Sequence, residues 1–208
     1  MLNKKVCIGL VFGGNSSEHE VSILSAKTIY NALLHTDNTD RFIVNPIYID
    51  KCGFWRDYEY SKSILFEGKR SISSSESNKD LMNNLTNIPK VSDNIDIWFP
   101  VLHGPNGEDG VIQGLFKLTG KPFVGSGILG SSLGMDKIAM KSIFKSVNLP
   151  QAPYVYLNKE DILNQLFMKS IFDKTDKIIK YPCFVKPANL GSSIGITKAH
   201  SRDELINA

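Results

Sequence analysis

The residues best suited to binding a phosphate group lie near the end of the chain, around Lys186. This lysine follows a short apolar stretch and precedes a turn rich in glycine and serine, residues 188–195. Backbone amides in such a turn can surround phosphate oxygens, and a lysine adds a compact positive charge. The motif GxxxxGK[ST] is absent, which excludes a P-loop NTPase. A hairpin loop without function is the alternative, but we favour phosphate binding because a lysine at this position has little structural purpose.

A second candidate site is the turn Gly13-Gly14-Asn15, with Glu18 close behind it. A strand, a glycine turn and the start of a helix form a corner that binds anions, because the first backbone N–H groups of a helix point toward the ligand. The segment is not the GxGxxG dinucleotide fingerprint. An acidic residue in a first helical turn also stabilises the helix dipole. Taken alone, this segment therefore favours a structural role for Glu18.

The third candidate is His103, which opens the segment HGPNGEDG after an apolar stretch. Open α/β sheets bind their ligands at the carboxyl ends of their strands, so this position suits a binding residue. Taken alone, the segment is equally consistent with a histidine that binds a ligand and with a histidine that is merely exposed on the surface. Lys137 is by itself typical of a solvated helix face.

A parallel sheet would bring the second and third of these loops, around Glu18 and His103, to one edge. Three short, nearly continuous apolar runs are typical of strands buried on both faces: residues 6–12, 42–50 and 95–102. Ser17 and Glu20 form a capping box that predicts a helix start. A largely apolar stripe at helical spacing follows, made of Val21, Leu24, Thr28 and Ala32. This β-α-β beginning predicts an open parallel sheet covered by helices.

The chain changes character at Gly125-Ser126-Gly127, which we interpret as a hinge between two domains, residues 1–124 and 125–208. We predict a helix from about residue 108 to residue 118 and a short strand at residues 121–124. Beyond the hinge we predict a helix at residues 135–147, strands at 154–157 and 183–187 with a helix between them, and a second capping box formed by Ser201 and Glu204. The serine-rich stretch at residues 71–80 is interpreted as a surface loop or insertion.

The composition is that of an ordinary globular protein of 208 residues, with 42% hydrophobic and 22% charged residues. Its net charge is only +3 and its lysines are scattered, so no nucleic-acid surface is indicated. No apolar stretch is long enough to span a membrane. Cys7, Cys52 and Cys183 are far apart and odd in number, which supports neither a disulfide framework nor a zinc site.

Four segments in one order resemble the D-alanine–D-alanine ligases, which are enzymes of the ATP-grasp superfamily. FGGNSSEHEVSILSA resembles their first signature, and FPVLHGPNGEDGVIQGLFKLTGKPFVGSG resembles the second. MDKIAMK follows in the expected place, and FVKPANLGSSIGI resembles the loop that closes over the triphosphate. The match covers nearly the whole chain apart from residues 60–90.

The resemblance implies a role for particular residues. Glu18 would hold the ammonium group of the first D-alanine, and His103 would line the D-alanine site. Lys137 and Lys186 would contact the phosphates of ATP. Gly191, Ser192 and Ser193 would lie in the loop over the triphosphate, and the resemblance links Ser192 to Glu18 by hydrogen bonds as a catalytic pair.

The implied fold is α/β: an N-terminal open parallel-sheet, Rossmann-like domain, followed by the start of an α+β ATP-grasp domain that is truncated. The implied reaction uses ATP and Mg²⁺, with Mn²⁺ as an alternative, to join two D-alanines for peptidoglycan precursors in the cytoplasm. Family members are longer, and the metal ligands would lie in the part beyond Ala208. We therefore expect this chain to be inactive by itself.

Three alternatives stay open at this point. The acceptor could be D-lactate or D-serine, because the residues that select it would lie mainly beyond Ala208. The chain could also be a binding module without catalysis. The resemblance suggests a homodimer, and it implies no nucleic-acid or membrane partner.

Overall fold

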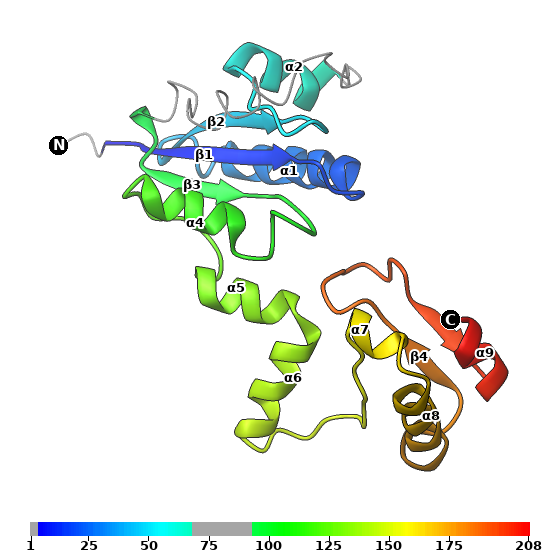
Figure 1. Cartoon of the computed structure of the whole chain (residues 1–208). Helices are drawn as coiled ribbons and strands as arrows, with labels where there is room; N and C mark the ends of the chain where they lie inside the picture. Colours follow the sequence, from blue (N-terminus) through cyan, green and yellow to red (C-terminus); the bar gives the residue numbers. More distant parts are fainter. Residues whose placement is uncertain (1–3, 68–92) are drawn as a thin grey trace. The chain divides into compact units, whose positions relative to one another are not determined.

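A computed structural model of the chain describes residues 4–67 and 93–208. The chain divides into two compact units, Met1–Ser132 and Leu133–Ala208 (Figure 1). The two domains expected from the sequence, 1–124 and 125–208, stay a prediction. The serine-rich stretch at residues 71–80 lies outside the described residues.

The first unit is built on a three-stranded parallel sheet, as predicted. Its strands are β1 (Val6–Gly13), β2 (Phe42–Ile49) and β3 (Ile97–Pro100), in the order β2-β1-β3. Both neighbours of β1 run parallel to it. The central strand is buried along almost its whole length, which explains its continuous apolar sequence.

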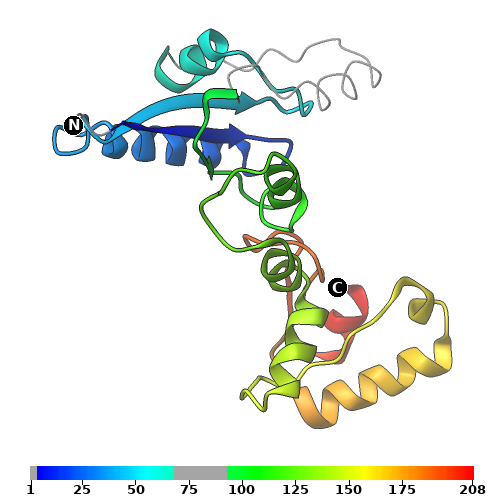
Figure 2. The same cartoon turned by 90° about the vertical axis from the view of Figure 1, so that its left-hand side faces the viewer.

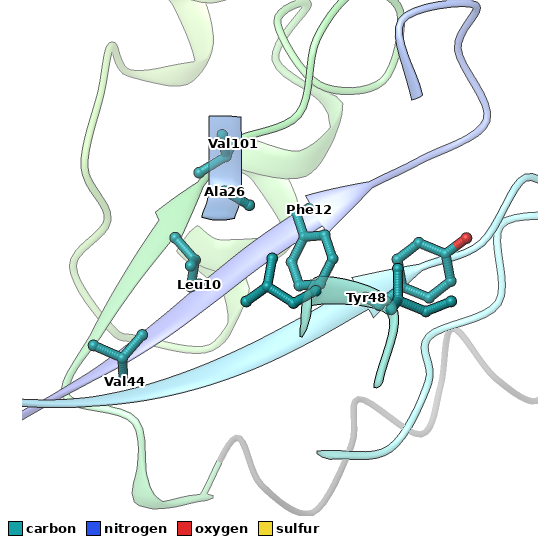
Figure 3. Close-up of a cluster of buried hydrophobic side chains, with 8 residues drawn as sticks. Leu10, Phe12, Ala26, Val44, Tyr48 and Val101 are labelled. Carbon is teal, nitrogen blue, oxygen red and sulfur yellow. The ribbon is translucent and has the colours of Figure 1, made fainter. Parts of the chain in front are cut away.

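Helices cover both faces of this sheet. On one face, α1 (His19–Leu33) and α2 (Tyr58–Glu67) pack against alternate residues of β1. Figure 3 shows the core of that face, formed by Leu10, Phe12, Ala26, Val44, Tyr48 and Val101. On the other face, α4 (Val111–Leu118) packs against β1 and β3, and the Trp98 and Phe116 rings stack with centroids 4.8 Å apart. Figure 1 and Figure 2 both show α1 running along the strands.

The predicted buried stripe of α1 is wrong. Val21 and Leu24 are 52% and 67% exposed, whereas His19, Ser22 and Ala26 are buried. Small side chains at Ser22 and Ala26 let the helix approach the sheet closely, and this packing outweighs the apolar periodicity.

The predicted capping box of α1 does not form either. Glu18 occupies the N-cap and no side chain caps the helix. Glu20 instead pairs with Lys51 at 2.9 Å, and the hydrogen bond from Lys51 lowers the pKa of Glu20.

Two predicted elements before the second unit are shorter than expected. The helix predicted from residue 108 begins only at Val111, after Gly110 at φ +98°. Residues 121–124 contribute a single parallel bridge, Phe123 beside Trp98, in which the Trp98 N–H donates to the Pro122 carbonyl and the Val124 N–H donates to the Trp98 carbonyl. The next helix, α5 (Ile128–Met135), ends at Met135, and the extended residue Asp136 separates it from the helix that begins at Lys137, so the predicted helix 135–147 is interrupted there.

The second unit contains α6 (Lys137–Ser146), α7 (Lys159–Ile162), α8 (Gln165–Lys174), the π-helical turn η2 (Thr175–Ile179) and α9 (Arg202–Asn207). Its strands β4 (Cys183–Val185) and β5 (Thr197–Ala199) pair antiparallel. The strand predicted at residues 154–157 is wrong: these residues adopt no regular structure, since no described segment pairs with them.

Only one of the two hydrogen bonds of the second predicted capping box forms. Ser201 caps α9 by accepting from the Glu204 N–H at 3.3 Å, but the Glu204 carboxylate accepts from His200 N–H instead of from Ser201.

None of the helices within residues 4–67 and 93–208 has the length and apolar character needed to cross a membrane.

Candidate functional site

The candidate site that contains Glu18 and His103 lies at the carboxyl ends of β1 and β3. The chain leaves β1 toward β2 on one side and returns to β3 on the other, so the gap between β1 and β3 is the switch point of the sheet, where such folds bind ligands. A cavity of about 280 Å³ opens there. Its lining includes the turn after β1 and the loop after β3: Gly13, Gly14, Asn15, Ser16, Leu102, His103, Pro105, Asn106 and Gly107.

Glycine is required where β1 turns toward α1. Gly13 has φ +94°, and a Cβ at this position would lie 2.2 Å from the Ile49 carbonyl oxygen. The next residue, Gly14, donates its N–H to that same carbonyl at 2.7 Å. The turn therefore passes directly against the end of β2, which only a residue without a side chain allows.

Ser22 of α1 ties the ends of β1 and β3 together. Its hydroxyl accepts from Gly13 N–H at 2.8 Å and donates to the Val101 carbonyl at 2.5 Å. The side chain is fully buried. One hydroxyl thus fixes the starting points of both loops that line the cavity.

Glu18 lies where the turn meets α1. Its backbone N–H donates to Ser16 Oγ at 3.2 Å. A Cβ placed on Gly104, which has φ +71°, would lie 3.0 Å from Glu18 Oε2. The Glu18 carboxylate is therefore next to the residue that follows His103, although the two lie 86 positions apart in the sequence. The structure brings Glu18 and the His103 loop together.

The loop around His103 is held by Glu108. The Glu108 carboxylate accepts from Gly104 N–H at 2.8 Å, and its other oxygen lies 3.9 Å from His103 Nδ1. His103 Nε2 is buried and has no hydrogen-bond partner within the residues that the structure describes. This nitrogen therefore keeps an unused capacity for a hydrogen bond.

A pair of asparagines joins the two loops. Asn106 Nδ2 donates to Asn15 Oδ1 at 3.0 Å, across 91 positions of sequence. We did not single out Asn15, Asn106 or Glu108 from the sequence. The signal that could have found them is their position in the same two polar segments as Glu18 and His103.

The second unit contains the predicted phosphate-binding residues. Lys137 begins α6, and its ammonium donates to the Leu190 carbonyl. Its backbone N–H donates to the Ala188 carbonyl at 3.0 Å. The structure therefore places Lys137 against the loop that joins β4 to β5, and a solvated helix face is the wrong description of this residue.

Asp136 supports the position of Lys137 by capping α6. Its carboxylate accepts from Ile138 N–H and Ala139 N–H, each at 2.9 Å, and from Asn189 Nδ2 at 3.3 Å. The bond from Ala139, followed by the bond from Ile138, lowers the pKa of Asp136 against the opposing effect of burial. The cap therefore joins α6 to the same loop.

Lys186 lies at the end of β4, as predicted, with its Nζ 5.7 Å from the centre of the Phe184 ring. Lys198 of β5 reaches the same ring from 6.0 Å. Phe184 is itself 56% exposed. The hairpin thus presents an aromatic ring with two ammonium groups near it.

The loop between β4 and β5 has an unusual backbone. Ser192 and Ser193 adopt φ +49° and φ +62°, in the left-handed region that favours glycine. Such residues cost of order 1–3 kcal/mol each and gather at ligand-binding segments. Gly191 lies just before them, in open space.

The described residues do not supply a metal site. Within residues 4–67 and 93–208, no group of three or more His, Cys, Asp or Glu side chains could hold a metal ion. Cys7 and Cys183 are buried, Cys52 is exposed, and all three are free. Burial raises the pKa of both buried thiols.

Comparison with known families identifies two successive matches along the chain. The family model described as "D-ala D-ala ligase N-terminus" matches residues 7–126. The model described as "D-ala D-ala ligase C-terminus" matches residues 143–208.

Curated relatives match over almost the whole chain. A D-alanine–D-alanine ligase of Prochlorococcus marinus (strain NATL1A) is 66% identical over 206 residues, which is 99% of this chain and 58% of the relative. A D-alanine–D-alanine ligase of Synechococcus sp. (strain CC9605) is 48% identical over 205 residues, again 99% of this chain and 58% of the relative. The chain therefore spans about 58% of the length of these relatives.

Solved structures have the same fold. The VanG D-Ala:D-Ser ligase of Enterococcus faecalis superposes with a TM-score of 0.72 at 31% identity, covering 98% of this chain and 58% of the other. The D-alanine–D-alanine ligase of Coxiella burnetii superposes with a TM-score of 0.72 at 25% identity, covering 98% of this chain and 57% of the other.

Proposed function

The chain belongs to the family of D-alanine–D-alanine ligases, and we propose that this protein joins two D-alanines with cleavage of ATP to ADP and phosphate. The observation that carries the proposal is the placement of the Glu18 carboxylate beside Gly104 at the carboxyl edge of the sheet. A carboxylate in this corner can pair with the ammonium group of an amino acid. The polar Nε2 atom of His103 belongs to the same corner.

The proposed reaction has two steps. A carboxylate oxygen of the first D-alanine attacks the γ-phosphorus of ATP, which forms an acyl phosphate and releases ADP. The amine of the second D-alanine then attacks the acyl carbon, and the C–O bond to phosphate breaks. A free carboxylate is a poor acylating agent, so the acyl phosphate divides one difficult step into two easier ones.

Phosphoryl transfer depends on positive charge held against the phosphate oxygens. We propose that Lys137 and Lys186 supply this charge. The ammonium of Lys137 has three N–H donors. One donates to the Leu190 carbonyl, which leaves two for phosphate oxygens. Gly191, Ser192 and Ser193 would then cover the triphosphate with their backbone amides.

The catalytic pairing of Ser192 with Glu18 stays a proposal that rests on the family. Mg²⁺, or Mn²⁺ in its place, is the cation that we propose to accompany ATP. A homodimer and a cytoplasmic location are proposed from the family in the same way. Sedimentation equilibrium would check the dimer.

A second acceptor is the alternative function, since the VanG structure is that of a D-Ala:D-Ser ligase. Mass spectrometry of the products would decide between acceptors when a polypeptide continuing past Ala208 is given ATP, Mg²⁺ and D-alanine, with or without D-serine or D-lactate. Dialanine from D-alanine alone supports the proposal. Product only with D-serine or D-lactate would favour the alternative, and no ATP cleavage under any condition would refute both.

A further inference from the structure

Both ring nitrogens of His19 make hydrogen bonds, and the proposed reaction does not use this histidine. Its side chain is almost completely buried, at 1% exposure. Nδ1 lies 2.5 Å from the Gly14 carbonyl oxygen, and Nε2 lies 2.9 Å from the Tyr48 hydroxyl. The ring therefore connects the turn after β1 to the core.

The two contacts determine which ring nitrogen carries the proton. A carbonyl oxygen can only accept, so Nδ1 must donate to Gly14. In the neutral ring, Nε2 then accepts from the Tyr48 hydroxyl. Tyr48 has no exposed surface and packs edge-on to His19 with ring centroids 5.5 Å apart. The imidazole is consequently fixed in place as well as in its tautomer.

This bond orients the peptide group between Gly14 and Asn15. In a planar trans peptide, the C=O and the following N–H point in opposite directions. Because His19 holds the Gly14 carbonyl on the core side, the Asn15 N–H points away from the core. Gly14 and Asn15 both line the cavity, and no residue within 4–67 and 93–208 accepts a hydrogen bond from the Asn15 N–H.

We propose that His19 is a positioning residue that aims the Asn15 N–H into the cavity, where it donates to a carboxylate oxygen of the first D-alanine. This inference rests on the proposed function and deepens it. Glu18 would hold the ammonium end of the amino acid and the Asn15 amide its carboxylate end. While one carboxylate oxygen attacks phosphorus, the other stays bound to a donor that needs no rearrangement.

A pair of substitutions separates positioning from packing. His19→Asn keeps an N–H donor at the δ position for Gly14, whereas His19→Gln moves the amide to the ε position, toward Tyr48. Both remove ring volume from the core, so both should lower the melting temperature. In a polypeptide continuing past Ala208, we expect His19→Asn to keep the KM for the first D-alanine within about twofold, and His19→Gln to raise it roughly tenfold or more. The KM for ATP should stay unchanged in both. Equal effects of the two variants on the D-alanine KM would overturn the proposal.

NMR on the unsubstituted protein tests the geometry without any variant. Long-range ¹H–¹⁵N spectra should show the Nδ1–H tautomer at His19, and D-alanine should shift the Asn15 amide proton downfield. An Nε2–H tautomer, or an Asn15 amide that does not respond to bound D-alanine, would refute the inference. Failure of the proposed function is distinguishable, because D-alanine would then cause no ATP cleavage in the unsubstituted protein.

Discussion

At the scale of single residues, the site that contains Glu18 and His103 depends on a carboxylate and on the glycine beside it. A Cβ on Gly104 would lie 3.0 Å from Glu18 Oε2, so a side chain there would make the carboxylate shift. The Gly104 N–H is used by Glu108, which fixes the loop in this conformation. The Glu18 charge therefore lies against the backbone of a loop 86 positions away.

Glu18→Gln should raise the KM for the first D-alanine by about tenfold to a hundredfold. This is the loss of affinity expected when a hydrogen bond to a charged group is removed. The substitution keeps the size of the side chain but removes its negative charge. The KM for ATP should not change. Steady-state kinetics with each substrate varied in turn makes the measurement, and an unchanged dependence on D-alanine would rule out this role for Glu18.

Lys186→Ala should weaken ATP binding by about tenfold or more, because an ammonium contact to phosphate is lost. Lys198→Ala is the matched control, since Lys198 approaches the same Phe184 ring from β5. We expect the control to bind ATP within about twofold of the unsubstituted protein. Fluorescence titration with a labelled ATP analogue would measure the Kd of both variants and of the unsubstituted protein. Equal losses would mean that the hairpin attracts ATP only through general charge.

The sequence predicted which polar segments carry the candidate sites, but not the contacts inside them. Glu18, His103 and Lys186 stand out because they follow apolar strands. The role of Lys137 in holding the Leu190 carbonyl could not be predicted, because it joins residues 53 positions apart. His19 was equally hidden, since a histidine in a helix gives no sign of which carbonyl it will meet.

At the scale of elements, the sheet was predictable and the faces of the helices were not. The strands β1, β2 and β3 are continuous apolar runs, which few other structures can bury. Helix α1 offers two stripes at helical spacing, and close approach to the sheet selects the one with Ser22 and Ala26. Residues 154–157 show the limit of strand prediction, because a strand exists only if another segment pairs with it.

Ser22→Ala should lower the free energy of unfolding of the first unit by about 1–3 kcal/mol, since the buried Gly13 N–H and Val101 carbonyl lose their partner. Ser25→Ala is the control in the same helix, with the same change in helix propensity but no such bond. Urea unfolding followed by tryptophan fluorescence reports on the buried Trp98. Similar losses in both variants would contradict the bridging role of Ser22.

At the scale of the whole molecule, the candidate residues are divided between two units that each have their own framework. Glu18 and His103 depend on the parallel sheet of the first unit, and Lys137 and Lys186 depend on α6 and the β4–β5 hairpin of the second. The family matches follow the same order along the chain, with the N-terminal family at residues 7–126 and the C-terminal family at residues 143–208. Amino-acid binding and phosphate binding should therefore respond to different substitutions.

Turnover is the property that we expect to require more than the 208 residues. The curated relatives are longer, and this chain spans about 58% of their length. Phosphoryl transfer needs substrate, phosphates and charge aligned at the same moment, so a partial set of contacts can bind ligands without catalysing the reaction. We expect no D-alanine-dependent phosphate release from the 208-residue chain, and release from a polypeptide that continues past Ala208. Circular dichroism of the shorter chain controls for misfolding, and phosphate release by the folded shorter chain would show that these residues already form a complete site.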